Sequence, residues 1–510
     1  MVCCIHVDFL AGRGNAMTRL HSPAFATASP NNPIKPSLSL AIAVITLVGT
    51  IAVFHFPVNH DVSWSLTVAD KISAGETLYK SILEFNPPLF FTLAAAARAG
   101  GRLLGTSPEA VYRSGVLTAV LCSSFALWRW VPCNARRPLV FAFIGVALLL
   151  VGRDFGERDH ISMVLLMPSL VHGIRRSPAK VRVQTLVAAA AAAAYVLRPF
   201  YLPILFLLLL LDEHRFPHYT TMALGSAYLL AVIAFEPAFV QAASLFATVY
   251  YHWIGIPWYV LAISPTGLLA AGAALAAHLM RPRNDLAVRL SLAAVVGALA
   301  FIAQGKPFAY HALPALTFSL LAFLAIGAFH SRHRLLMFSM AGTAALAIGA
   351  PAFLTTDQVA RQEQSAVRAQ LLREPPGTRL LLWSWAIPNG FPASRDANAW
   401  WVGGTPSVWW VEIPNIPPPT ERFLRDLMAS DLARHPDIVA IDRAVTTRRR
   451  AYGGFDLRAY ILRDARISAM LSKEYGTVDS SGPLYIYRRV AGPKQGSRYR
   501  SALSASTQWR

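Results

Sequence analysis

Apolar runs of helical length recur along this chain from residue 38 to residue 354. A run of about 20 such residues forms one helix across the hydrocarbon core of a bilayer. Hydrophobic residues make up 55% of the 510 residues and charged residues only 15%, against roughly 25% charged residues in soluble domains. The sequence therefore predicts a polytopic α-helical membrane protein. A β-barrel would instead show short segments of alternating hydrophobicity.

Eleven of these runs are candidate spans, so we expect about 11 transmembrane helices. The candidates are residues 38–54, 114–131, 138–151, 161–174, 183–197, 200–211, 220–235, 259–280, 290–303, 313–329 and 335–354. Several are shorter than a perpendicular crossing needs. The pair on either side of Arg198 and Pro199 is either two short crossings or a kinked helix with a re-entrant turn.

Basic residues orient the predicted spans, because cytoplasmic loops are enriched in lysine and arginine. Alternate short loops carry Arg136, Arg137, Arg175, Arg176, Lys180, Arg182, Arg215, Arg281, Arg283, Arg289, Arg332 and Arg334. The opposite short loops contain only Arg153, Arg158, Arg198 and Lys306. We therefore expect a multi-pass plasma (inner) membrane protein with a cytoplasmic N-terminus and an extracytoplasmic C-terminal domain. Because the basic residues are spread over loops, the net charge of +20 does not indicate a nucleic-acid partner.

The composition divides the chain into four parts. Residues 1–37 are expected to be a disordered cytoplasmic segment, and residues 38–354 a transmembrane domain with a large first external loop at 56–113. Residues 355–490 mix charged residues with β-like runs at 379–385, 437–442 and 484–488 and an amphipathic stretch at 421–433, which predicts a small extracytoplasmic α/β domain. Residues 491–510 read as a disordered basic tail.

Tryptophan is concentrated in the predicted α/β domain. The residues are Trp383, Trp385, Trp400, Trp401, Trp409 and Trp410. Such a cluster forms a packed core, an interfacial belt or a platform for sugar rings. These alternatives stay open, with core or belt favoured.

The first external loop contains two candidate catalytic acids. Asp61 lies just beyond the first apolar run, and ionisable groups held at a membrane boundary are functional candidates. For Asp61 a structural role remains equally open. Glu84 precedes the pair Pro87 and Pro88, which can open a helix but cannot continue one. A simple turn accounts for the two prolines, but it does not account for an acidic residue at position 84.

A second polar segment, GRDFGERDH at residues 152–160, packs six ionisable groups into nine positions between two apolar runs. They are Arg153, Asp154, Glu157, Arg158, Asp159 and His160. A simple connector does not need this density. Arginine binds phosphate with two parallel hydrogen bonds, and a carboxylate can orient or deprotonate a hydroxyl group. The segment therefore indicates a phosphate-binding site with a proton acceptor.

A third segment, QGKPFAYH at residues 304–311, precedes another apolar run. Lys306 and His311 could pair with a lipid phosphate at the membrane surface. The alternative is a snorkelling lysine beside an interfacial tyrosine, Tyr310. The cysteines, at positions 3, 4, 122 and 133, form no metal-ligand pattern with histidine, so no metal site is predicted.

Five motifs together resemble the GT-C superfamily of membrane glycosyltransferases, which includes protein O-mannosyltransferases, aminoarabinose transferases and bacterial Rgt-type enzymes. The motifs are HDVSW (60–64), AGETLY (74–79), ILEFNPPL (82–89), GERDH (156–160) and QGKPFAYHALPA (304–315). The resemblance covers residues 38–354 and is strongest before residue 170. It implies transfer of a sugar from a polyprenyl-phosphate carrier at the external membrane face, with a lipid or glycan as acceptor.

The resemblance also implies roles for individual residues. Asp61 matches the acid of the first external loop, and one of Asp154, Glu157 or Asp159 matches a second acid. Val62 follows Asp61 where the mannosyltransferases have another acid, so the substrate is not specified. The remaining candidates, expected to bind substrate or to support catalysis, are Glu84, Arg158, His160, Lys306, Tyr310 and His311.

The expected activity is that of an inverting enzyme, with Asp61 as base. No cofactor is evident, although a divalent cation is possible. An O-antigen polymerase or ligase, a membrane transporter and a non-catalytic scaffold are the rival hypotheses. A transporter should show internal repeats and charges at mid-membrane.

Overall fold

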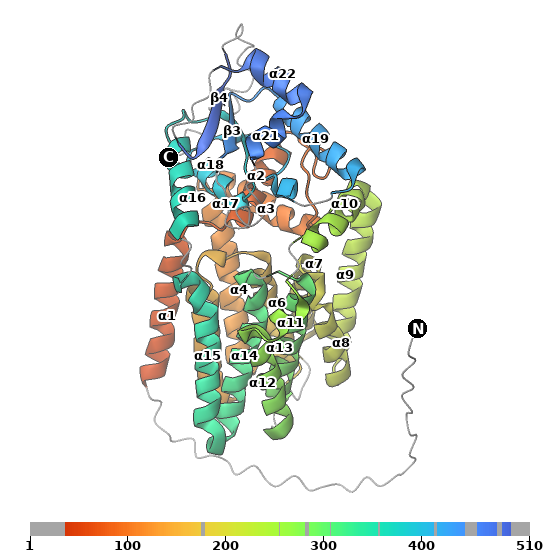
Figure 1. Ribbon diagram of the computed structural model, residues 1–510. Coiled ribbons are helices and arrows are strands. Elements are labelled where there is room, and N and C mark those ends of the chain that lie inside the picture. The colour runs from red at the N-terminus through yellow and green to blue at the C-terminus, as the bar shows by residue number, and fades with distance from the viewer. Residues whose placement is uncertain are drawn as a thin grey trace.

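A bundle of long helices carries a mixed α/β domain at one end in the computed structural model (Figure 1). The structure describes residues 36–174, 179–253, 256–280, 285–306, 308–354, 358–412, 416–443, 456–476 and 482–490. The predicted N-terminal segment and basic tail lie outside the described residues, apart from the first turn of α1.

Six helical segments within the described residues are long and apolar enough to cross a membrane. They are α1 (Pro36–His55), α4 (Pro108–Trp130), α5 (Cys133–Ile144) with its π-helical continuation Gly145–Leu150, α9 (Phe216–Phe235), α13 (Asp285–Gln304) and α14 (Ala309–Phe329). Shorter apolar helices accompany them: α7 (Val181–Leu197), α8 (Leu202–Leu211), α12 (Pro265–Met280) and α15 (Arg334–Leu354). The prediction of a helical membrane protein is confirmed at this level.

Two predicted spans have a different form in the structure. The run at 259–280 divides into α11 (Trp258–Ala262) and α12, because Pro265 disfavours helical geometry at the residue before it. The chain also breaks between α7 and α8 at Arg198, where a short 3₁₀ turn, Pro199–Tyr201, intervenes. Helix α10 (Pro237–Trp253) was not among the predicted spans. It packs Phe239 against Tyr79, with 5.2 Å between ring centroids.

The predicted first external loop is largely helical. It contains α2 (His60–Ser73) and α3 (Pro88–Leu104). Asn59 caps α2, because its side-chain oxygen accepts a hydrogen bond of 2.8 Å from the backbone nitrogen of Asp61. The paired prolines open α3, as the sequence predicts.

The C-terminal domain contains a four-stranded sheet in the order β2-β1-β3-β4. Its strands are β1 (Arg379–Trp383), β2 (Trp400–Trp401), β3 (Ile438–Asp442) and β4 (Leu484–Arg488). β1 is parallel to β2 and β3, and β4 is antiparallel to β3. The three predicted β-runs are therefore present, and the predicted amphipathic stretch corresponds to α19 (Pro418–Leu432).

Further helices surround this sheet: α16 (Gln358–Leu371), α17 (Ile387–Gly390), α18 (Ala393–Asp396), α21 (Leu457–Leu462) and α22 (Ala465–Glu474). Three tryptophans of the cluster, Trp383, Trp401 and Trp410, are each only 2% exposed. For these three, a packed core is the correct interpretation.

Helix α2 is held firmly against the C-terminal domain. The Lys71 ammonium, 1% exposed, donates to the backbone oxygens of Trp401 and Val402 at 3.2 Å and pairs with Glu76 at 2.9 Å. Burial lowers the pKa of Lys71, although the charge of Glu76 opposes this shift. A buried ammonium must be paired with acceptors. The position of α2, which carries Asp61 at its other end, is therefore coupled to the C-terminal domain.

Candidate functional site

Residues from all three polar segments meet at the end of the bundle that carries the C-terminal domain (Figure 1). Asp61 on α2 faces Arg158 at the start of α6 (Arg158–His172), with 3.6 Å between the charged atoms. Asp159 on α6 contacts His311 on α14 at 2.9 Å. Segments separated by about 100 and 150 residues thus form one site.

A tight turn holds the second segment in place. Gly156 has a φ of +83°, and a Cβ atom there would lie 2.9 Å from a ring carbon of Tyr112. The Tyr112 hydroxyl donates a hydrogen bond of 2.8 Å to the Gly156 oxygen. Only glycine fits such a position without strain. The next residue, Glu157, then caps α6 by accepting from the backbone nitrogen of Asp159 at 2.6 Å.

Asp159 joins three helical elements through its fully buried carboxylate. One oxygen accepts from the Tyr201 hydroxyl at 2.6 Å. The other pairs with the Arg198 guanidinium and with Nδ1 of His311. A buried carboxylate requires such partners, because an unpaired charge in an apolar interior is very costly. Asp159 is therefore saturated and has a positioning role.

His311 presents its second ring nitrogen to the site. Because an ionised carboxylate can only accept, Nδ1 of His311 must donate to Asp159. Nε2 is buried and has no hydrogen-bond partner among the described residues. The same is true of Nε of Arg198. These two polar atoms can therefore hydrogen-bond a ligand.

Glu157 is also fully buried and lies between two arginines. Its Oε1 atom is 3.4 Å from Nε of Arg158 and 3.2 Å from the guanidinium of Arg198. Burial and the neighbouring Asp159 carboxylate raise the pKa of Glu157, although both arginines oppose the shift. The Oε2 atom of Glu157 caps α6, so its Oε1 atom is the one that holds the side chains of Arg158 and Arg198 in position.

Asp61 differs from the other acids at the site. Its carboxylate has two ion-pair contacts within the described residues, with Arg158 at 3.6 Å and His60 at 3.7 Å, and both are longer than a hydrogen bond. The side chain is 14% exposed. Burial alone would raise the pKa of Asp61, but the charges of His60, Arg158 and Arg198 outweigh it and lower the pKa. Asp61 is an ionised carboxylate with free acceptor capacity.

Basic side chains gather around this carboxylate. The guanidinium carbon of Arg158 lies 5.3 Å from the centre of the Phe90 ring. Lys306 is 3% exposed. Burial, together with the charges of Arg198 and Arg158, lowers the pKa of Lys306 to about 6, although Asp61 opposes the shift. An anion bound here would offset the positive charge of Arg158 and Arg198 and would favour the protonated form of Lys306.

Three of the predicted site residues stabilise the turns and helix ends around the site through hydrogen bonds. Glu84 accepts from the indole nitrogen of Trp64 at 2.7 Å and from the Asn86 side chain at 2.8 Å, which fixes the turn before α3. Asp154 accepts from the Asn59 side chain at 3.0 Å, which ties the turn to the start of α2. The third residue is His160.

His160 is fully buried, and both of its ring nitrogens are engaged. Nδ1 accepts from the Gly156 backbone nitrogen at 3.1 Å, so Nε2 carries the proton and donates to the Ala147 oxygen at 3.0 Å. The remaining predicted residue, Tyr310, lies edge-on to His311 with 4.3 Å between ring centroids, and stacks on Phe308.

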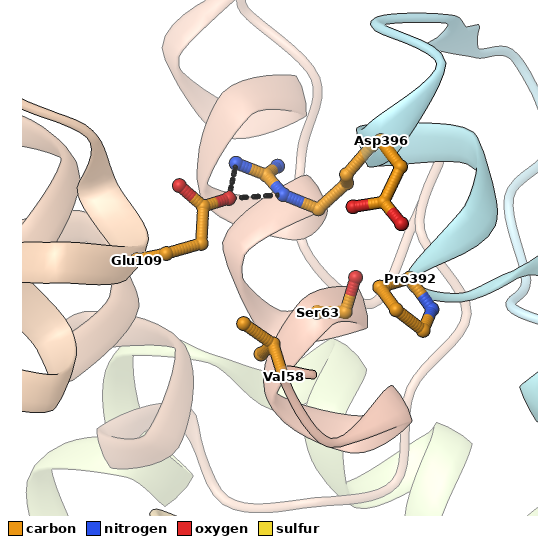
Figure 2. Close-up of a pocket in the computed structure, with 6 residues that line it drawn as sticks. Val58, Ser63, Glu109, Pro392 and Asp396 are labelled. Carbon is orange, nitrogen blue, oxygen red and sulfur yellow. Dashed lines mark hydrogen bonds and ion pairs between the residues drawn. The ribbon is translucent and has the colours of Figure 1, made fainter. Parts of the chain in front are cut away.

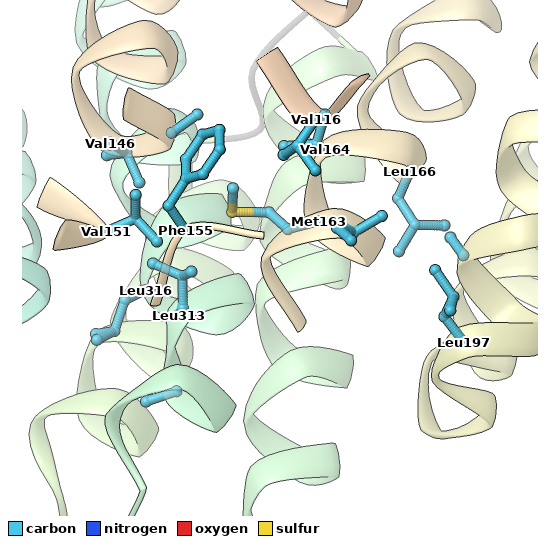
Figure 3. Close-up of a cluster of buried hydrophobic side chains, with 14 of the residues drawn as sticks. Val116, Val146, Val151, Phe155, Met163, Val164, Leu166, Leu197, Leu313 and Leu316 are labelled. Atoms are coloured by element: carbon cyan, nitrogen blue, oxygen red, sulfur yellow. The ribbon is translucent and has the colours of Figure 1, made fainter. Parts of the chain in front are cut away.

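Apolar side chains pack around the turn and the start of α6. Figure 3 shows Val151, Phe155 and Met163 packed near Leu313 of α14, and all four are buried. The charged groups therefore border a closely packed, water-poor interior. Electrostatic interactions are stronger there than in water.

Sequence reasoning missed Arg198 and Tyr201 as site residues. Arg198 entered the topology analysis only, although an arginine inside an apolar stretch is itself a signal of function. Tyr201 carried no such signal. Among the described residues, no group of three or more histidines, cysteines or acids is placed to hold a metal ion.

Comparison of the chain with protein-family models and with curated proteins finds no match.

The buried lysine predicts a pH dependence of stability. The pKa of Lys306 falls from an ordinary 10.5 to about 6 on folding, so between these values the unfolded chain binds more protons. Stability must then rise with pH across this window. We expect Lys306→Met to reduce that rise, as measured by thermal unfolding of the full chain in nanodiscs at several pH values. An unchanged pH slope would contradict the buried position of the amine.

Proposed function

We propose that this protein is an inverting, GT-C-type membrane glycosyltransferase that transfers a sugar from a polyprenyl-phosphate donor to an acceptor at the extracytoplasmic face. One observation carries the proposal. An ionised carboxylate with free acceptor capacity, Asp61, faces a cluster of buried cations at one end of the helical bundle. This arrangement suits a proton acceptor beside an anionic leaving group.

Arg158 carries the charge that meets the donor phosphate, Lys306 takes up a proton as the phosphate binds, and Nε of Arg198 and Nε2 of His311 supply further polar atoms. Arg158 can bind two phosphate oxygens at once. Asp159 orients the His311 ring by accepting a hydrogen bond from Nδ1, which leaves Nε2 directed to the ligand. The cations are fixed before substrate arrives, so little reorganisation is needed when negative charge develops on the phosphate.

The reaction is a single displacement. The acceptor hydroxyl oxygen forms a bond to the anomeric carbon while the bond from that carbon to the phosphate oxygen breaks. The electron pair of the broken bond stays on the phosphate, and Asp61 takes the hydroxyl proton. Attack from the side opposite the phosphate inverts the anomeric centre.

The proposed topology has eleven spans, with the N-terminus cytoplasmic in the plasma (inner) membrane. In this proposal the six long apolar segments, the four shorter apolar helices and α6 each cross the membrane once. An O-antigen polymerase or ligase would use the same donor chemistry and remains the nearest enzymatic rival. A transporter is less well supported, because its site should lie near mid-membrane.

Topology is tested by cysteine labelling in a background without the native cysteines. Lys80 and Ser472, both exposed, are on the side of the C-terminal domain, whereas Glu213 follows α8 near the opposite end. We expect an impermeant thiol reagent added outside to label Lys80→Cys and Ser472→Cys, and to label Glu213→Cys only after permeabilisation. External labelling of Glu213→Cys would contradict the proposed orientation.

The role of Asp61 is tested by Asp61→Asn, which removes the charge and the proton-accepting ability at almost constant size. A general base contributes about 10²–10⁴-fold to rate, so we expect transfer from polyprenyl-phosphate sugars to fall by about that factor. Transfer is measured with a panel of lipid-linked sugars and purified protein in nanodiscs. Asp154→Asn is the matched control, because the Asp154 carboxylate lies nearby but accepts a hydrogen bond from Asn59. Its transfer rate should fall far less. Near-normal transfer by a folded Asp61→Asn protein would exclude Asp61 from the chemistry.

A further inference from the structure

A pocket of about 240 Å³ lies beside Ser63 of α2 (Figure 2). Its lining comes from α2 and the residues just before it, the first turn of α4 and the C-terminal domain: Val58, Ser63, Glu109, Pro392, Arg395 and Asp396. Residues two apart on a helix point about 200° apart around its axis. Ser63 and Asp61 therefore face opposite sides of α2.

The charged groups of the pocket are only partly used by one another. Arg395 is neutralised by Asp70 and by Oε1 of Glu109, each at 2.6 Å. Oδ2 of Asp396 pairs with Arg368 at 2.6 Å. The other oxygens, Oε2 of Glu109 and Oδ1 of Asp396, have no hydrogen-bond or ion-pair contact within the part of the chain that the structure describes. Because Arg98 also pairs with Asp70 at 2.6 Å, three acids face three arginines, and the two free carboxylate oxygens are the remaining acceptors.

Ser63 gives a second, independent sign of a ligand. Its side chain is fully buried, and its hydroxyl has no hydrogen-bond partner among the described residues. Figure 2 shows this hydroxyl pointing from α2 toward the space beside Pro392 and Asp396. A buried hydroxyl without a partner is costly. A polar ligand in the pocket would remove that cost.

These groups define the chemistry of the ligand. Free carboxylate oxygens accept hydrogen bonds and repel phosphate, so the ligand donates hydrogen bonds and is neutral or positively charged. The volume is below the roughly 300–1,000 Å³ of pockets for drug-sized ligands, so it suits one small ring. Pro392 and Val58 offer apolar surfaces for the C–H face of such a ring.

We propose that this pocket binds one monosaccharide unit of the acceptor, and that the acceptor is therefore a glycan with neutral or amino-substituted sugars. The inference rests on the proposed function, which left a lipid or a glycan open. Val58 and Ser63 bracket Asp61 in sequence. An acceptor anchored here reaches Asp61 around the N-terminal end of α2, and a neighbouring sugar presents the hydroxyl that reacts.

The test uses the full chain in nanodiscs with Asp61→Asn, so that binding is measured without transfer. The probes are the methyl glycosides of glucose, N-acetylglucosamine and glucosamine, with inorganic phosphate as the opposite chemistry, and binding is followed by saturation-transfer NMR. We expect saturable binding of the glycosides and no competition by phosphate, because the free carboxylate oxygens of Glu109 and Asp396 repel an anion.

Substitutions locate the binding in the pocket. Loss of one hydrogen bond should weaken glycoside affinity about tenfold in Ser63→Ala and in Asp396→Asn. Ser65→Ala is the matched control, because Ser65 is equally buried on α2 but donates to the Val62 oxygen at 2.8 Å, and its affinity should not change.

Absence of saturable binding by all three glycosides, or equal affinity in Ser63→Ala and its parent, would overturn the subsite. Failure of the proposed function gives a different result. Glycosides would then bind in the pocket while the protein with Asp61 intact transfers no sugar from any lipid-linked donor. Transfer to a lipid acceptor without glycoside binding would remove the subsite alone.

Discussion

The buried carboxylate of Asp159 is the constraint on which the arrangement of the site depends. A charge in an apolar interior must be paired, and here the partners come from the end of α7, the following turn and α14. This pairing fixes Arg198 and orients His311, so two cationic or polar groups reach the site in a defined geometry. Because the interactions are buried, they are screened little by solvent.

The second constraint is the position of α2. Arg158 and Asp61 face each other only because α2 is held across the end of the bundle. Its far end is held by Lys71, which bonds to backbone oxygens of the C-terminal domain. Arg395 of that domain also bridges Asp70 and Glu109. The C-terminal domain therefore contributes to the site indirectly, by positioning the helix that carries Asp61.

The sequence predicted the helical membrane class, the α/β domain and the three polar segments, because apolar runs and dense charges are local features. It did not predict that Glu84 and His160 would be occupied by supporting hydrogen bonds, since their partners are set by turns and packing. The pairing of Arg198 with Asp159 was not predicted, because the two residues lie 39 positions apart in the chain. Helix α2 of the first external segment was missed because its amphipathic pattern is shorter and more polar than a span.

The central claim is that the buried cations at the end of the bundle bind a lipid-linked phosphate beside Asp61. A cryo-EM structure of the full chain in nanodiscs with a polyprenyl phosphate tests it most directly. The account predicts phosphate density between Arg158, Lys306 and Nε2 of His311, with the prenyl chain running into the membrane and Asp61 facing the phosphate. Phosphate density elsewhere, with this cluster of residues unoccupied at saturating lipid, would contradict it.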